Sequence, residues 1–121
     1  MLNADPVLAV LSRALDTAAL RQTVHATNVA NADTEGYRRL EVISPAELQR
    51  MNAEAPAQGV EEALVWSQPQ PEVVESAETA VRLDQEMAQM AENAVRYQAL
   101  LGAIERTLGM LQTAARDGRG G

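Results

Sequence analysis

Residues 83–111 read LDQEMAQMAENAVRYQALLGAIERTLGML, and this stretch decides the fold. Apolar side chains recur in it at alternating spacings of four and three residues, the period of a helix that packs along one stripe. The stripe consists of Leu83, Met87, Met90, Ala94, Tyr97, Leu101, Ile104, Leu108 and Leu111. Because the spacing holds over roughly four heptads, it predicts a coiled-coil-like helix, which we place at residues 76–115.

A second long helix is predicted at the N-terminal end of the chain, over residues 5–31. Asp5 supplies an acceptor for the first free backbone amides of a helix, and Pro6 has the fixed φ that suits the first helical turn. The apolar positions Leu8, Leu11 and Leu15 follow at helical spacing. Two terminal helices therefore frame the chain.

Residues 32–75 join these helices through a turn, a short helix and a linker. Asn31 to Tyr37 gathers short polar side chains before Gly36, which can take a positive φ, so this segment predicts a turn. Ser44 and Glu47 have the spacing of a capping box, which predicts a short helix from Ser44 to about Asn52. From residue 53 to 75 the chain is rich in proline and glutamate, and we interpret this stretch as an extended acidic linker with Leu64-Val65-Trp66 as an apolar anchor or a brief strand.

The predicted fold is all-α: two long terminal helices form a coiled-coil-like hairpin, and residues 116–121 form a flexible tail. We treat residues 1–121 as a single subunit. A helix of about 39 residues would be about 58 Å long, whereas a compact globule of this chain length is roughly 35 Å across. The sequence therefore describes a subunit that packs against neighbours.

Composition excludes several classes of function. Seventeen acidic residues stand against ten basic ones, and this acidic excess argues against nucleic acid as a partner. The chain has no cysteine, no glycine-rich phosphate loop and no metal-ligand spacing, so we expect no cofactor, no metal site and no small-molecule substrate. His25 is the only histidine. A catalytic pair of His25 with Asp33 or Asp16 is conceivable, but a histidine at a helix surface or interface is the favoured interpretation, because general acid–base chemistry needs a pocket.

Two segments resemble a known family. Residues 28–37, NVANADTEGY, resemble the signature that closes the first helix in flagellar rod, hook and hook-associated proteins. Residues 86–93, EMAQMAEN, and 97–100, YQAL, look like the C-terminal helix of the proximal rod protein of the FlgB type. The resemblance marks Asn28, Asn31, Thr34, Gly36 and Tyr37 as the family turn motif. Many family members have proline where this chain has Glu35.

The resemblance implies a non-enzymatic, structural subunit of the flagellar basal-body rod in the periplasm. Such a subunit is exported by the flagellar type III apparatus without a cleaved signal peptide and assembles helically through its terminal helices. Its implied partners are copies of itself, other rod proteins, and basal-body ring and export-gate components. The implied subunit-packing residues are Leu8, Leu11 and Leu15 together with the stripe of the C-terminal helix. The alternative is a small acidic helical chaperone or adaptor of a secretion system.

Overall fold

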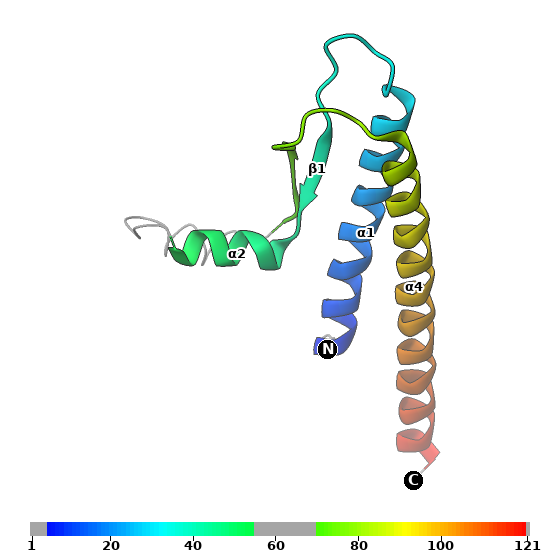
Figure 1. Cartoon of the computed structure of the whole chain (residues 1–121). Helices are drawn as coiled ribbons and strands as arrows, with labels where there is room; N and C mark the ends of the chain where they lie inside the picture. The colour runs from blue at the N-terminus through cyan, green and yellow to red at the C-terminus, as the bar shows by residue number, and fades with distance from the viewer. Residues whose placement is uncertain (1–4, 55–69, 121) are drawn as a thin grey trace.

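A computed structural model describes residues 5–54 and 70–120 of the chain. The elements follow in the order α1 (Pro6–Ala30), β1 (Leu40–Ile43), α2 (Pro45–Glu54), β2 (Glu72–Glu75) and α4 (Leu83–Gly120). Figure 1 shows α1 and α4 lying side by side in opposite directions, which confirms the predicted helical hairpin. The predicted anchor Leu64-Val65-Trp66 and most of the acidic linker lie outside the described residues.

The predicted ends of α1 are confirmed to within one residue. The Val7 amide donates to Asp5 Oδ1 at 2.8 Å, so Asp5 caps the helix, and Pro6 occupies its first position. At the other end the Asn31 amide donates to Thr27 O at 3.1 Å. The turn that follows has a left-handed residue at Gly36, with φ of 79°, as its sequence predicts.

Helix α2 begins with the predicted capping box. The Glu47 amide donates to Ser44 Oγ at 3.2 Å, and the Ser44 amide donates to Glu47 Oε2 at 3.4 Å. Figure 1 shows α2 projecting sideways from the hairpin. The Arg21 guanidinium lies 4.0 Å from Glu47 Oε1, and this long ion pair links the start of α2 to α1.

The structure also contains a two-stranded sheet, which the all-α prediction did not include. Its strands precede and follow α2 in the chain. Strands β1 and β2 pair antiparallel, with Leu40 opposite Glu75 and Ile43 opposite Glu72. Beyond the ladder, the Ser76 amide donates to Arg39 O and the Arg39 amide donates to Thr79 O, both at 2.9 Å. Pairing between residues 29 to 35 positions apart is not visible in local periodicity, which is why the sequence did not reveal this sheet.

The limits predicted for the C-terminal helix, residues 76–115, were wrong at both ends. Because the backbones of Ser76 and Thr79 bond to Arg39, this segment is not helical, and α4 begins at Leu83. Residues 116–120, predicted as a flexible tail, continue the helix to Gly120. This end contains no proline to break the helix, and its glycines lower helix stability without ending the helix.

The buried interior of the described residues is small and largely polar. Its apolar side chains are Ala18, Val24 and Val42. The buried polar side chains are Thr17, Asn28, Ser76, Glu86, Asn93 and Thr107. A polar group buried without a hydrogen bond destabilises the fold, so the bonds made by these side chains decide whether the hairpin holds.

Helix α4 extends past the first residue of α1. Hydrogen bonds join Asn93 to Ala18 and Glu86 to Asn28, so in this antiparallel pair Pro6 lies level with roughly residue 107 of α4. Residues 108–120 therefore form an overhang of about 20 Å. An open groove beside its start is lined by Val7 and Leu11 from α1 and by Thr107 and Met110 from α4.

We predict that Gly36→Val lowers the free energy of unfolding by about 1–2 kcal/mol, because a β-branched residue is strongly disfavoured at positive φ. Apart from its two chain neighbours, no heavy atom of the described residues lies within 4 Å of a Cβ placed on Gly36, so the cost comes from the backbone and not from a clash. Urea unfolding of the purified chain measures it. The neighbouring control, Glu35→Ala, alters an exposed side chain and should change stability by less than about 0.5 kcal/mol. Equal effects of the two substitutions would contradict the left-handed turn.

Candidate functional site

Asn28 joins three parts of the molecule at the turn end of the hairpin. Asn28 belongs to α1, and its side chain is completely buried. Asn28 Oδ1 accepts from the Tyr37 hydroxyl at 2.6 Å and from the Leu40 amide at 3.0 Å. Asn28 Nδ2 donates to Leu40 O at 2.8 Å and to Glu86 Oε2 at 2.7 Å. One amide group thereby connects α1 with the turn, with β1 and with α4.

Glu86 is the charged centre of this arrangement, which we call the polar cluster: His25, Asn28, Tyr37, Arg39, Ser76 and Glu86. The Glu86 side chain is 2% exposed, although it carries a carboxylate. Its Oε2 accepts from Asn28 and from His25 Nδ1, the latter at 2.7 Å, and its Oε1 accepts from Arg39 Nε at 2.7 Å. Since a carboxylate can only accept, Nδ1 is the nitrogen of His25 that carries the hydrogen in this bond.

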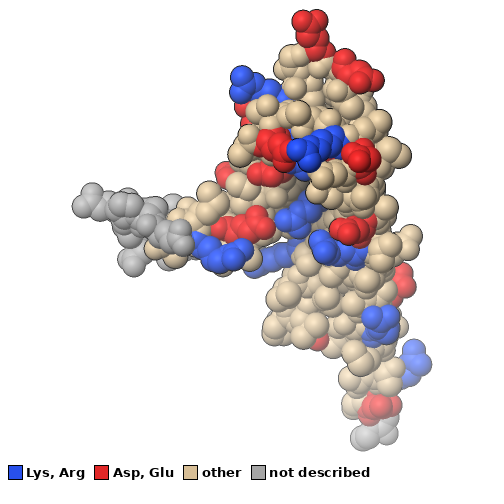
Figure 2. Space-filling model, in the orientation of Figure 1, with Lys and Arg blue, Asp and Glu red and all other residues tan. Residues whose placement is uncertain are grey.

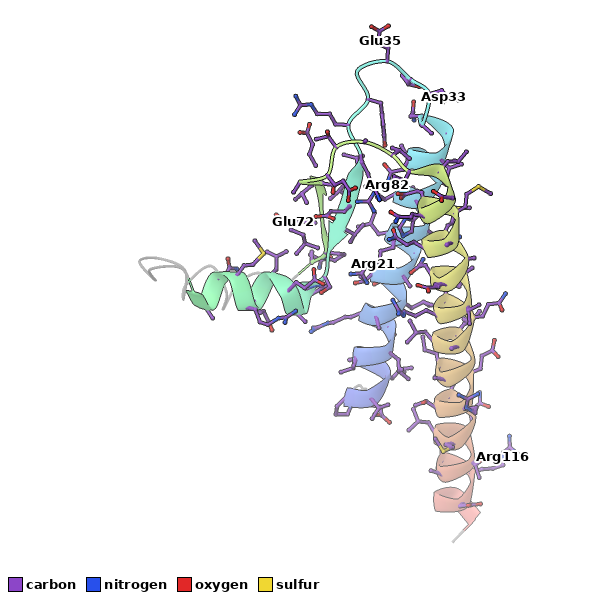
Figure 3. The ribbon with its side chains drawn as sticks, viewed as in Figure 1. Arg21, Asp33, Glu35, Glu72, Arg82 and Arg116 are labelled. Carbon is purple, nitrogen blue, oxygen red and sulfur yellow. The ribbon has the colours of Figure 1, made fainter. Side chains whose placement is uncertain are left out.

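Arg39 extends the polar cluster to the residue after β2 and to the next turn of α4. Its Nη1 donates to Ser76 Oγ at 3.0 Å, and its Nη2 donates to Gln89 Oε1 at 3.2 Å. Figure 3 shows the side chains of these segments converging between the sheet and the upper part of the hairpin. Arg39 thus fixes the sheet to α4, while Asn28 fixes it to α1.

Two ionisable groups of the polar cluster have shifted pKa values. Burial alone would raise the pKa of Glu86, but the hydrogen bonds from Arg39, Asn28 and His25 outweigh it, so the pKa lies below its ordinary value of 4.5. Burial raises the pKa of Tyr37 above 10.0; the Glu86 charge adds to this effect and Arg39 opposes it. At neutral pH the Glu86 carboxylate is therefore ionised, and the Tyr37 hydroxyl remains a donor to Asn28.

Asn93 makes a second tie between the helices, two turns further along α4. It is 3% exposed, and its Nδ2 donates to Ala18 O at 2.7 Å and to Gln22 Oε1 at 2.8 Å. Its Oδ1 is buried without a hydrogen-bond partner in the described part of the chain. A cavity of about 290 Å³ lies beside it, bordered by His25, Arg39 and Arg96.

The geometry gives His25 a structural role. Its partner is Glu86, and neither of the two aspartates considered from the sequence is bonded to it in the described residues. In residues 5–54 and 70–120, no group of histidine and acidic side chains could hold a metal ion. No helix among the described residues is long and apolar enough to cross a membrane.

The turn motif and the packing stripe lie in different surroundings. Asn28 and Tyr37 belong to the polar cluster. Asn31 Nδ2 donates to Thr27 O, the Thr34 hydroxyl donates to Asn31 Oδ1, and Gly36 is left-handed.

The predicted packing residues differ in exposure. Partly buried members of the set are Leu8, Leu11, Leu15, Met90, Ala94, Tyr97 and Ile104. Its exposed members are Leu83, Met87, Leu101, Leu108 and Leu111. We call these five the outer row.

The residues buried in α4 do not coincide with the predicted stripe. Glu86, Asn93 and Thr107 are buried, and each precedes a stripe residue, namely Met87, Ala94 and Leu108. One residue corresponds to a rotation of about 100° around the helix. Helix α4 therefore turns polar side chains inward and leaves much of its apolar stripe accessible, so the packing role of that stripe remains a prediction.

Sequence reasoning missed Arg39, Ser76, Glu86 and Asn93 as site residues. Glu86 and Asn93 were noticed only as part of the family-like segment. A usable signal was present, because these two polar residues are seven apart and share one side of a helix in a heptad pattern. Arg39 and Ser76 gave no such signal, since their roles depend on the unpredicted sheet.

Fold and site together define a helical hairpin held closed by a buried polar cluster. The ionisable side chains of its polar cluster are bonded to one another and hold segments in place. Residues 8–38, which include most of α1 and the turn, match the family of flagella basal body rod proteins. No curated protein matches the chain. The family match supports a structural role in the flagellar basal-body rod.

We predict that Glu86→Gln lowers the free energy of unfolding at pH 7 by about 2–4 kcal/mol, because Arg39 would remain buried beside a neutral amide. The substitution should also reduce the loss of unfolding free energy as the pH falls toward 3. A carboxyl with a lowered folded-state pKa stabilises the fold above its unfolded pKa, and this stabilisation is lost as pH falls below about 4.5.

Urea unfolding between pH 3 and pH 7 measures both effects. Glu92→Gln, on the exposed side of the same helix, is the control and should leave stability and its pH dependence nearly unchanged. If the unfolding free energy falls equally steeply with decreasing pH in Glu86→Gln and in the unsubstituted chain, Glu86 is not the source of the acid sensitivity.

Proposed function

We propose that the chain is a structural subunit of the proximal rod of the bacterial flagellum, similar to rod proteins of the FlgB type. The observation that carries the proposal is the family match over residues 8–38. The turn motif inside this match supplies two members of the polar cluster, Asn28 and Tyr37. The segments that carry the likeness to the FlgB type, residues 86–93 and 97–100, include Glu86, the opposite half of the same cluster.

The outer row of α4 supplies the surface for assembly. Leu83 is 46% exposed, Met87 50%, Leu101 38%, Leu108 43% and Leu111 40%. The row runs from Leu83 to Leu111, which is about 42 Å along the helix. Apolar side chains repeated at heptad spacing along one accessible side fit a neighbouring helix.

In this proposal the two terminal helices pack against copies of the chain and against other rod proteins. The subunit reaches the periplasm through the flagellar type III apparatus without a cleaved signal peptide, and it meets basal-body ring and export-gate components at the base of the rod. The polar cluster closes each hairpin within its own subunit, which leaves the outer row for contacts between subunits.

We predict that Leu101→Asp or Leu108→Asp abolishes swimming while the isolated chain stays folded. Both side chains are about two-fifths exposed, so each substitution should cost the isolated chain less than about 1 kcal/mol. In an assembly the new carboxylate would be buried against a neighbouring helix, at a cost of several kcal/mol. The control Gln98→Asp adds the same charge at another exposed position of α4 and should leave swimming intact.

Purified basal bodies test the proposal itself. The chain should be present in them, and the two leucine variants should be absent, although urea unfolding shows both variants to be stable. A chain that is missing from basal bodies and stays in the cytoplasm as a soluble dimer would contradict the rod role and favour a chaperone.

A further inference from the structure

The cavity beside Asn93 lies where the two helices of the hairpin meet the sheet. Val24 and His25 line it from α1, Val42 lines it from β1, and Gln89 and Asn93 line it from α4. The two valines form an apolar part of the wall, while the histidine and the two amide side chains can form hydrogen bonds. We call this site the Asn93 cavity.

Asn93 brings to this cavity an acceptor that no group of the described residues satisfies. Asn93 is 3% exposed, and its Nδ2 donates to Ala18 O at 2.7 Å and to Gln22 Oε1 at 2.8 Å. A backbone carbonyl can only accept, so the amide nitrogen must face Ala18 and the amide group cannot be turned around. Its Oδ1 is then buried without a hydrogen-bond partner in the described part of the chain. A buried acceptor in this condition destabilises a fold.

Two donors that line the cavity are engaged with other side chains. His25 Nδ1 bonds to Glu86 Oε2 at 2.7 Å. Each of the three nitrogens of the Arg39 guanidinium group likewise donates to a side chain other than Asn93. The polar cluster therefore holds both donors toward its own acceptors, and Asn93 Oδ1 needs a donor of another kind.

The cavity has the size and the polarity that water requires. Its volume of about 290 Å³ is many times the roughly 10–15 Å³ that admits one water molecule. Acceptors and donors both line it, because Glu41 and Glu92 carry carboxylates and Arg96 carries a guanidinium group. Figure 2 shows acidic and basic side chains mixed on the face of the molecule where the sheet meets the hairpin. Such a lining favours a small neutral molecule that both donates and accepts over an ion of either sign.

We propose that the Asn93 cavity holds a resident water molecule that donates a hydrogen bond to Asn93 Oδ1. This water satisfies the buried acceptor, and its other hydrogen and its lone pairs bond to the polar lining, since buried waters in proteins make about three hydrogen bonds. Asn93 then ties α4 to α1 directly through Nδ2, and through the water it is tied to the wall of the cavity that β1 forms. The inference concerns the subunit alone and does not depend on the proposed rod function.

Asn28 provides a matched comparison in the same hairpin. Both asparagines are buried, and both donate from Nδ2 across the contact between α1 and α4. Asn28 Oδ1, however, accepts from the Tyr37 hydroxyl and from the Leu40 amide, so protein groups satisfy it. A resident water is therefore expected at Asn93 and not at Asn28.

Magnetisation transfer from water to the full-length, ¹⁵N-labelled chain tests the proposal. A resident water gives NOE and ROE cross peaks of opposite sign at the protons beside it, whereas proton exchange gives cross peaks of the same sign. The side-chain amide of Asn93 should show the pair of opposite sign, and the side-chain amide of Asn28 should not. Absence of this pair at Asn93, cross peaks of the same sign only, or an equal pair at both asparagines would overturn the proposal.

The variant Arg96→Met distinguishes a water from a protein donor. Arg96 is exposed and lines the cavity three residues after Asn93, so its guanidinium group is the rival donor to Oδ1. Methionine removes that donor and retains a high helix propensity. The pair of opposite sign should persist in the variant with an intensity within about twofold, as in the control Arg116→Met at another exposed position of α4. A pair that appears only after Arg96 is replaced would assign Oδ1 to Arg96 and overturn the proposal.

Discussion

Burial of the Glu86 carboxylate is the constraint on which the rest of the structure depends. An ion removed from water destabilises a fold strongly unless its oxygens are paired, and here both oxygens accept hydrogen bonds. The donors come from α1 and from the residue that precedes β1, while the carboxylate belongs to α4. The requirement to satisfy one charge therefore brings together segments up to 61 residues apart in the chain.

This constraint also determines which side of α4 remains available. Because Glu86 and Asn93 must face α1 to be satisfied, the apolar residues beside them on α4 are turned partly outward. A hairpin buried entirely through its apolar stripe would retain little surface for neighbours. The polar cluster thus links the folding of one subunit to the surface that we propose for assembly.

The sequence predicted the helices well because their signals are local. Asp5 and Pro6 predicted the start of α1, Ser44 and Glu47 predicted the start of α2, and Gly36 predicted a left-handed turn. The start of α4 was placed seven residues too early, because Ser76 and Thr79 are held by Arg39 through bonds between distant segments. Periodicity predicted an apolar stripe on α4 but not the direction that it faces, since a few hydrogen bonds to Glu86 and Asn93 set the rotation of the helix.

Amide hydrogen exchange along the chain tests most directly the claim that the polar cluster holds the hairpin. The account predicts the slowest exchange in three places: the α1 amides near Asn28, the α4 amides from Glu86 to about Tyr97, and the Leu40 amide, which is bonded to Asn28. Exchange should become faster along α4 toward the overhang that starts at residue 108, where α1 no longer covers it. Uniform protection along α4, or slower exchange in the overhang than around Glu86, would contradict the account.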